Sequence, residues 1–300
     1  MKTSLDCLPC YLRQALQVAR LSTDDRDLQV EALRKVAELT SKMDMTRTPP
    51  ENSIAVYKTL AEITTCPDPY HEIKKESNEQ ALALRPQFAD MITNAADPLA
   101  LAIRLAIGGN IIDFGAMHSF DIDEALDRCL QAEYAVDNGV LLLQRLRKLD
   151  KGAKLLYLAD NSGEIVYDSL VVKELAAMGL NVTVAVKSGA IINDALLVDA
   201  RSVGMEEYAT LLENGTNCPG TPLESCSEEF LGAFANADLI LSKGQGNFET
   251  LSESERDIFF LLTIKCPVVG AHLAEISGTD KEKLPGEGEL ALYYSNGKSA

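Results

Sequence analysis

The 300-residue sequence has no tryptophan, only three histidines and far fewer basic than acidic residues, with 28 Lys and Arg against 45 Asp and Glu. Its formal charge of −17 argues against nucleic acid or an anionic membrane surface as a partner, because both select a basic face. No apolar run is long enough to span a bilayer, and the start of the chain lacks the apolar segment of a signal peptide. These absences predict a soluble protein of the cytoplasm, and the hydrophobic share of 46% is ample for a core.

The seven cysteines are scattered and odd in number, which does not predict a disulfide framework and indicates a reducing compartment. Two of them, Cys7 and Cys10, form a C-x-x-C pair, a spacing that is used for zinc binding or redox chemistry. Zinc needs about four ligands, so Cys66, or Cys218 together with Cys226, would have to complete a site. The alternative is that the pair fills a small core at the start of a helix.

Residues 1 to about 105 show apolar residues at helical spacing and no β-rich run. Ser53 is expected to cap the third helix of this region, and Pro86 is expected to interrupt the fourth. We therefore predict an all-helical N-terminal domain over residues 1–105 and a second domain over residues 106–300.

From Lys151 onward, strands alternate with helices, which is typical of an α/β protein with a doubly wound, mainly parallel sheet. The predicted strands are Leu155–Ala159, Val182–Val186, Glu207–Leu211, Leu239–Ser242 and Pro267–Gly270, with a final edge strand near Leu290–Tyr294. The predicted helices lie near 164–178, 193–202, 228–235 and 254–264, and residues 121–149 are also expected to be helical, with Gly139 interrupting them.

A polar turn, Asp160-Asn161-Ser162-Gly163, separates the first of these strands from a helix that starts at Glu164. Open α/β sheets bind ligands at such carboxyl ends of strands. Asp160 and Asn161 offer oxygen ligands for a divalent cation, while Ser162, Gly163 and the amides of the helix start offer donors for an anion. Adjoining cation and anion sites indicate phosphate chemistry, and the alternative is an ordinary turn with an N-cap.

Further candidates follow the other predicted strands. Asp194 lies after the second strand and is predicted to face Asp160 and Asn161, completing an open Mg²⁺ or Mn²⁺ site, unless it is only a charge at a helix start. The segment KGQGNFE begins at Lys243, after the fourth strand, and its two glycines allow the backbone to approach a ligand closely. Lys265, which precedes the fifth predicted strand, is expected to reach a phosphate from the opposite edge.

Several motifs together resemble the damage-control phosphatase family, formerly the domain-of-unknown-function-89 family. They are DNSGEIVYD at 160–168, INDA at 192–195 and KGQGNFETL at 243–251, and GNIIDFG at 109–115 with the early C-x-x-C is similar to the small microbial branch. The resemblance extends over essentially the whole chain. It implies a helical N-terminal region, a Rossmann-like C-terminal domain, and a metal-dependent phosphatase acting on phosphorylated metabolites that include sugar phosphates and their damaged forms.

The resemblance also implies roles by position. Asp160, Asn161 and Asp194 match the family's ligands for a divalent metal, Mn²⁺ or Mg²⁺, with other first-row divalent ions as alternatives. The substrate contacts predicted from the residues and the resemblance together are Asn161, Ser162, Gly163, Lys243, Gln245, Gly246, Asn247, Glu249, Lys265, Asn110 and Asp113. Asp160, Asp194 or Glu164 is expected to take the proton of the attacking water, and a covalent aspartyl-phosphate is the alternative.

Two other functions are compatible with the sequence. One is transfer of a methyl group from S-adenosylmethionine to protein carboxylates, an activity attributed to a eukaryotic branch of the same family, although the first turn here has only one glycine. The other is a non-catalytic sensor that binds a phosphorylated metabolite without turnover. The loop KGQGNFE differs from the larger basic loop of the family's sugar-phosphate-active eukaryotic branch, so the sequence does not identify the physiological substrate. It does not give the oligomeric state either.

Overall fold

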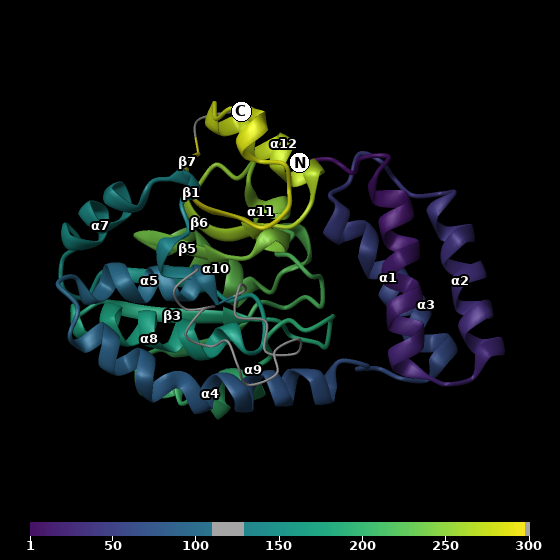
Figure 1. Ribbon diagram of the computed structural model, residues 1–300, viewed down its shortest axis with the longest axis horizontal. Helices are drawn as coiled ribbons and strands as arrows, with labels where there is room; N and C mark the ends of the chain where they lie inside the picture. Colours follow the sequence, from purple (N-terminus) through teal and green to yellow (C-terminus); the bar gives the residue numbers. More distant parts are fainter. Residues whose placement is uncertain (110–128, 298–300) are drawn as a thin grey trace.

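The computed structural model describes residues 1–109 and 129–297, and Figure 1 shows a central sheet with helices packed on it and a helical bundle to one side. Two predicted substrate contacts, Asn110 and Asp113, lie outside the described residues. In the described part, no helix has both the length and the apolar character that crossing a bilayer requires.

The described strands form one seven-stranded sheet in the order β1-β7-β6-β5-β2-β3-β4. Their bounds are β1 Tyr134–Asp137, β2 Lys154–Leu158, β3 Asn181–Val186, β4 Thr210–Glu213, β5 Leu239–Lys243, β6 Asp257–Ile264 and β7 Glu289–Asn296. All neighbouring pairs are parallel except β6 and β7. The chain runs from β2 outward to β4 and returns to β5 on the other side of β2, so the switch point, where such sheets bind ligands, lies between β2 and β5. The predicted α/β fold with a mainly parallel, doubly wound sheet is confirmed.

Helices cover both faces of this sheet. Their bounds are α1 Cys7–Ser22, α2 Arg26–Thr40, α3 Pro49–Thr64, α4 His71–Thr93, α5 Pro98–Gly108, α7 Gly139–Arg147, α8 Glu164–Ala177, α9 Leu197–Ser202, α10 Glu228–Asn236, α11 Gln245–Leu251 and α12 Pro267–Ser277. Helices α4, α5 and α8 share one core with the sheet, and α10, α11 and α12 share the other. Successive residues of β2 alternate between the two, so Leu155 belongs to the first core and Leu156 to the second. Burial on both faces explains why the central strands are apolar throughout.

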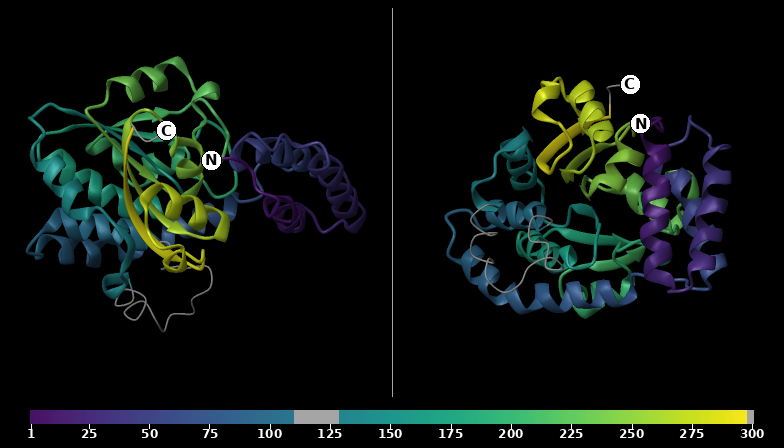
Figure 2. Two further views of the ribbon diagram at one scale, coloured as in Figure 1. Left: turned by 90° about the horizontal axis from the view of Figure 1, so that it is seen from above. Right: turned by 45° about the vertical axis from the view of Figure 1, so that its right-hand side comes forward.

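The first three helices form a bundle of their own. They pack on one another around a small core that includes Tyr11, Val36 and Leu60, and Figures 1 and 2 show them beside the sheet. Helices α4 and α5 instead pack against α8. The helical segment before residue 105 therefore contributes to two cores, and the domain boundary placed there stays a prediction.

Local signals set the ends of these helices. Asp97 caps α5 with its side chain, as its position before a proline indicates. The predicted cap of α3 at Ser53 is wrong, because Thr48 caps the helix in a capping box with Glu51 and both prolines fit into the first turn. Pro86 lies inside α4 without ending it.

Two elements near the C-terminus are exchanged relative to the prediction. The predicted helix 254–264 is the strand β6, and the predicted strand Pro267–Gly270 is the first turn of α12. The run DIFFLLTI is almost entirely apolar, so periodicity does not distinguish a buried strand from a buried helix. Pro267 suits the first position of a helix, where its missing N–H is not needed. Lys265 therefore follows a strand instead of preceding one.

Other boundaries also differ from the prediction. The segment 121–149 contains β1, and Gly139 begins α7 instead of interrupting a helix. The predicted edge strand Leu290–Tyr294 is β7, but β1 pairs with its outer side and forms the edge. Strand β4 begins at Thr210, where the prediction had Glu207, and helix α9 begins at Leu197, where the prediction had residue 193. β1, β4 and α9 are short, and short elements carry little periodicity to read.

Candidate functional site

The loops after β2 and β3 are joined by main-chain hydrogen bonds. Asn161 and Asp194 form an isolated antiparallel bridge, the Ser162 N–H donates to the Asn193 carbonyl at 2.9 Å, and the Ala195 N–H donates to the Asp160 carbonyl at 2.8 Å. Helix α9 begins only at Leu197, so Asp194 is not a helix-start residue. The pairing holds the side chains of residues 160, 161 and 194 in one place at the switch point of the sheet.

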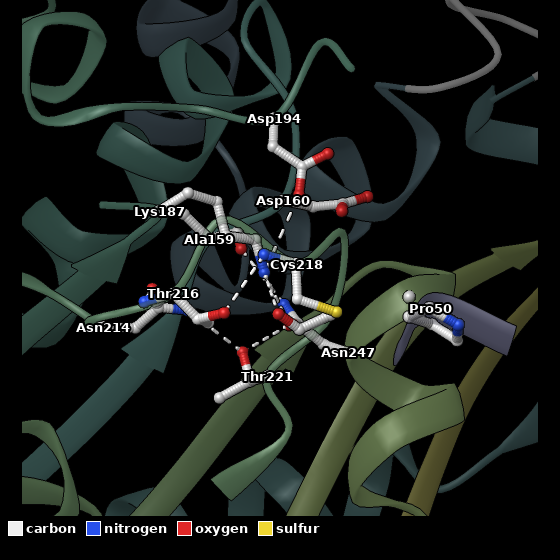
Figure 3. A network of polar contacts seen from close by, with 12 residues as sticks. Pro50, Ala159, Asp160, Lys187, Asp194, Asn214, Thr216, Cys218, Thr221 and Asn247 are labelled. Carbon is white, nitrogen blue, oxygen red and sulfur yellow. Dashed lines mark hydrogen bonds and ion pairs between the residues drawn. The ribbon is translucent and has the colours of Figure 1, made fainter. Parts of the chain in front are cut away.

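The two aspartates of this site are buried, with 8% of Asp160 and 3% of Asp194 exposed. Burial raises the pKa of Asp160 well above its usual value, and the neighbouring carboxyls of Glu164 and Asp194 raise it further. Burial also raises the pKa of Asp194, to about 6, although the ammonium of Lys187 opposes the shift. In Figure 3 the two carboxyl groups lie next to each other. Two adjacent carboxyls that resist ionising together are a place where a cation is favourable.

The donor atoms of the site fit a hard divalent cation. The Asp194 Oδ2 atom is buried without a hydrogen-bond partner in the described part of the chain. The Asn161 amide nitrogen donates to Asp160 Oδ2 at 2.9 Å and to Glu164 Oε1 at 2.7 Å, which leaves the amide oxygen for a ligand. Carboxylate and amide oxygens are the ligands that Mg²⁺ and Mn²⁺ prefer. No group of three or more His, Cys, Asp or Glu side chains among the described residues is placed to hold a metal, so two carboxylates with one amide form the candidate set.

A glycine makes room for the Asp160 side chain. Gly244 has a φ of 85°, and a Cβ built on it would lie 2.0 Å from Asp160 Cγ. A Cβ on Gly246 would lie 1.7 Å from the Pro219 carbonyl oxygen. The two glycines thus allow the loop after β5 to pack against the protein's own chain, a use that the sequence did not reveal.

Lys243 forms a buried ionic network with Glu164 and Asp168 of helix α8. Its ammonium, with 1% of the residue exposed, lies 2.9 Å from Asp168 Oδ1 and 3.2 Å from Glu164 Oε2, and the Tyr157 hydroxyl donates to Asp168 at 2.6 Å. Burial acts to lower the pKa of Lys243, but Asp168 and Glu164 outweigh it, so the net pKa is raised. The lysine is therefore charged and paired with helix α8.

A cavity of about 330 Å³ lies between helices α1 and α3 and the ends of β2, β5 and β6. Of the predicted site residues, its wall includes Asp160, Asn161, Asp194, Gln245, Gly246, Glu249 and Lys265. The predicted residues Ser162, Gly163, Glu164, Lys243 and Asn247 are described but do not belong to this wall. The structure thus brings the three candidate ligands together with Lys265 and one end of helix α11.

Two residues of the site were missed by sequence reasoning. Lys187 follows β3 and is 2% exposed, and its ammonium donates to the Gly220 carbonyl at 2.6 Å and to Asn247 Oδ1 at 3.2 Å, 3.7 Å from Asp194 Oδ2 (Figure 3). A lysine directly after a buried strand was the available signal. Asn78 of α4 accepts the Gly163 N–H at 2.7 Å, so this amide is already used, and no local signal could have indicated it.

Comparison with known proteins places the chain in a family. The model of the damage-control phosphatase ARMT1-like domain matches residues 3–279. The chain is 34% identical over 278 residues to damage-control phosphatase PH1575 of Pyrococcus horikoshii, covering 91% of this chain and 94% of that protein. A damage-control phosphatase of Archaeoglobus fulgidus is 32% identical over 274 residues, covering 90% and 94%.

The fold agrees with this relationship. The crystal structure of the DUF89 family protein PH1575 from Pyrococcus horikoshii matches with a TM-score of 0.86 at 33% identity, over 97% of this chain and 98% of that one. The chain therefore belongs to the damage-control phosphatase ARMT1-like family, as its motifs indicated.

Proposed function

We propose that the protein is a divalent-metal-dependent phosphatase that hydrolyses phosphomonoesters of small metabolites, such as sugar phosphates and their damaged forms. The observation that carries the proposal is the meeting of two buried carboxyls, Asp160 and Asp194, with the Asn161 amide in the wall of one cavity. Relatives that are named damage-control phosphatases support the same reaction class.

The candidate ligands Asp160, Asn161 and Asp194 would hold the cation. The chemistry that such a cation supplies is Lewis-acid stabilisation of the phosphoryl charge and activation of water. Lys187 favours the ionised form of Asp194, because its ammonium lowers the pKa of that carboxyl. Glu164 orients Asn161 by accepting its amide N–H at 2.7 Å.

The remaining roles concern the phosphate and the proton. Lys265 would bind the non-bridging oxygens of the phosphoryl group from the wall of the cavity. Both carboxylate oxygens of Glu164 are engaged, one by Asn161 and the other by Lys243, so Glu164 acts through its neighbours. Asp160 and Asp194 remain as acceptors for the proton of the attacking water.

One assay tests the proposal. The purified protein, freed of metal with EDTA, is supplied with Mn²⁺ or Mg²⁺ and a panel of phosphorylated metabolites, and inorganic phosphate is measured. We expect metal-dependent release from at least one substrate and its loss in Asp194→Asn. Tight binding of a phosphorylated metabolite without release would support a sensor instead. Methyl transfer from S-adenosylmethionine to protein carboxylates would support the methyltransferase alternative.

A further inference from the structure

Glu249 occupies a place in the cavity that metal binding does not use. It lies on helix α11 with 7% of the residue exposed, and it lines the same cavity as Asp160 and Lys265. Its Oε1 atom accepts a hydrogen bond from the Gln245 amide at 2.7 Å. Within residues 1–109 and 129–297, its second oxygen, Oε2, has no hydrogen-bond partner. One carboxyl oxygen is thus fixed and the other is available to a bound ligand.

The orientation of this carboxyl is tied to the loop that follows β6. Gln245 donates to Glu249 through its amide nitrogen and accepts the Lys265 main-chain N–H at 2.9 Å through its amide oxygen. Gln245 therefore positions both the Glu249 carboxyl and the main chain of Lys265, the residue that would bind the phosphoryl oxygens. A phosphate ester bound at Lys265 would occupy the cavity that Glu249 also lines.

The groups that face Glu249 are largely uncharged near neutral pH. Burial raises the pKa of Cys7 to about 11, and it also raises the pKa values of Tyr11 and Cys266, all of which interact with Glu249. The charged group that acts on the pKa of Glu249 is the Met1 ammonium, which donates to the Glu249 main-chain carbonyl at 3.4 Å. Asp160, Asp194 and Lys265 line the same cavity. Two cysteines of the wall, Cys7 from the C-x-x-C pair and Cys266, therefore supply surroundings of low polarity.

Burial in these surroundings raises the pKa of Glu249 to about 7, although the hydrogen bond from Gln245 and the Met1 ammonium act to lower it. A carboxyl with such a pKa holds its proton in a large fraction of molecules at neutral pH. General acids work best when their pKa lies near the working pH.

We propose that Glu249 is the general acid that protonates the leaving-group oxygen of the phosphate ester, an inference that rests on the proposed phosphatase function. As the bond between phosphorus and the ester oxygen breaks, its electron pair stays on that oxygen, which takes the proton from Glu249 Oε2 and leaves as the alcohol. The carboxylate that remains is reprotonated by solvent. The attacking water supplies the fourth oxygen of inorganic phosphate, so the products are one alcohol and one phosphate.

The test compares two kinds of substrate in the wild type and in Glu249→Gln. An alkyl phosphate needs protonation of its leaving group, whereas p-nitrophenyl phosphate releases a stable phenolate that does not. We expect kcat/KM of the variant to fall about 100-fold for the alkyl substrate and less than about threefold for the aryl substrate. In the wild type, kcat/KM for the alkyl substrate should fall as pH rises through about 7, and the aryl substrate should not show this limb.

Glu255→Gln is the matched control. Glu255 follows α11, is exposed and does not belong to the cavity wall. This variant should retain wild-type rates on both substrates. Equal losses on both substrates in Glu249→Gln, or no loss on either, would overturn the assignment of the general acid. The two wild-type pH profiles decide the question even if the variant does not fold, because identical profiles also overturn the assignment. A wild type without turnover would overturn the phosphatase proposal and this inference with it.

Discussion

Asp194 balances two opposing influences, a buried position that favours its neutral form and the Lys187 ammonium 3.7 Å away that favours its ionised form. Asp194→Asn keeps the size of the side chain and one oxygen ligand but removes the charge. We expect a folded protein whose Mn²⁺ affinity and phosphatase activity at limiting Mn²⁺ both fall at least about tenfold, as for loss of a group that supports a metal. Calorimetric titration with Mn²⁺ and phosphate release measure the two effects. Wild-type affinity in the variant would show that Asp194 is not a ligand.

A substitution at Gly244 tests whether the close approach of the loop after β5 is needed to hold the Asp160 carboxyl in place. In Gly244→Ala, the new Cβ would lie 2.0 Å from Asp160 Cγ at a φ of 85°. We expect a loss of roughly 3 kcal/mol or more in the free energy of unfolding, from the unfavourable φ and the overpacking together, and loss of metal binding. Denaturant unfolding and Mn²⁺ titration measure these.

Gly204→Ala is the control for the backbone contribution. Gly204 has a φ of 73°, and nothing lies within 4 Å of a Cβ built there. This variant should lose only about 1–2 kcal/mol and bind Mn²⁺ normally. If Gly244→Ala and Gly204→Ala changed the free energy of unfolding and Mn²⁺ binding equally, the contact with Asp160 would contribute to neither.

At the scale of elements, β5 and α8 are joined by the buried ionic network of Lys243, Glu164 and Asp168. Lys243→Met removes the one cation and leaves two buried carboxylates unpaired. Breaking a buried pair in this way costs about 3–5 kcal/mol, so we expect a strongly destabilised or insoluble variant. The predicted role of Lys243 in substrate binding gives a different result, a stable protein with a raised KM. Thermal unfolding together with kinetics distinguishes the two.

An exposed ion pair gives the comparison for this variant. Arg201 pairs with Glu206 at 3.0 Å, and both side chains are more than half exposed. Arg201→Met should change the free energy of unfolding by less than about 1 kcal/mol, because water already solvates both charges. A similar change in the free energy of unfolding in Lys243→Met and Arg201→Met would show that the buried ionic network does not stabilise the fold.

The sequence identified those elements whose pattern is decided locally. The boundaries of β2, β3, β5, α8 and α10 were predicted closely. The three strands are compact apolar runs, α10 is amphipathic, and α8 begins and ends beside the glycines Gly163 and Gly179. The prediction for the segment 254–270 was wrong, because an apolar run that is buried on both faces has no hydrophobic periodicity. The strand β1 failed because a four-residue segment takes its structure from pairing with β7, a partner more than 150 residues away in the chain.

The candidate site divides in the same way. Asp160, Asn161 and Asp194 could be proposed because they follow strands, and topology alone brings such loops to one edge of a sheet. Lys187 and Asn78 could not, since their roles depend on tertiary hydrogen bonds to Asn247 and Gly163. Cys266 was likewise not connected with the C-x-x-C pair, because the cavity that they share is formed only when α1 meets the loop after β6.

At the scale of the molecule, the cavity is shared between two parts of the fold. Helices α1 and α3 of the bundle supply part of the wall, including Cys10 and Tyr11, and the loops after β2 and β6 supply another part, including Asp160 and Lys265. A ligand bound between them contacts both parts. Binding at this site should therefore stabilise the whole chain against unfolding, because a ligand that binds only the folded state shifts the equilibrium toward it.

The size of that stabilisation should depend on pH. Burial raises the folded-state pKa of Asp194 to about 6 and that of Asp160 well above its usual value. Without a cation, such raised carboxyl pKa values contribute stability at low pH that is lost as pH rises through them. A cation at this site would bind the ionised carboxylates, so it would compete with protons at low pH and be favoured at higher pH.

We therefore expect Mn²⁺ at about 100 times its Kd to stabilise the wild type by roughly 2–3 kcal/mol at pH 8, a rise of several degrees in Tm. At pH 5, the same total concentration of Mn²⁺ should raise Tm far less, because protons occupy the carboxyls. Differential scanning calorimetry with Mn²⁺ or EDTA at the two pH values measures this. At pH 8, Asp194→Asn, whose affinity should fall at least about tenfold, should show about half of the wild-type shift or less. An equal rise at pH 5 and pH 8, or an undiminished rise in the variant, would mean that the cation binds somewhere other than between Asp160, Asn161 and Asp194.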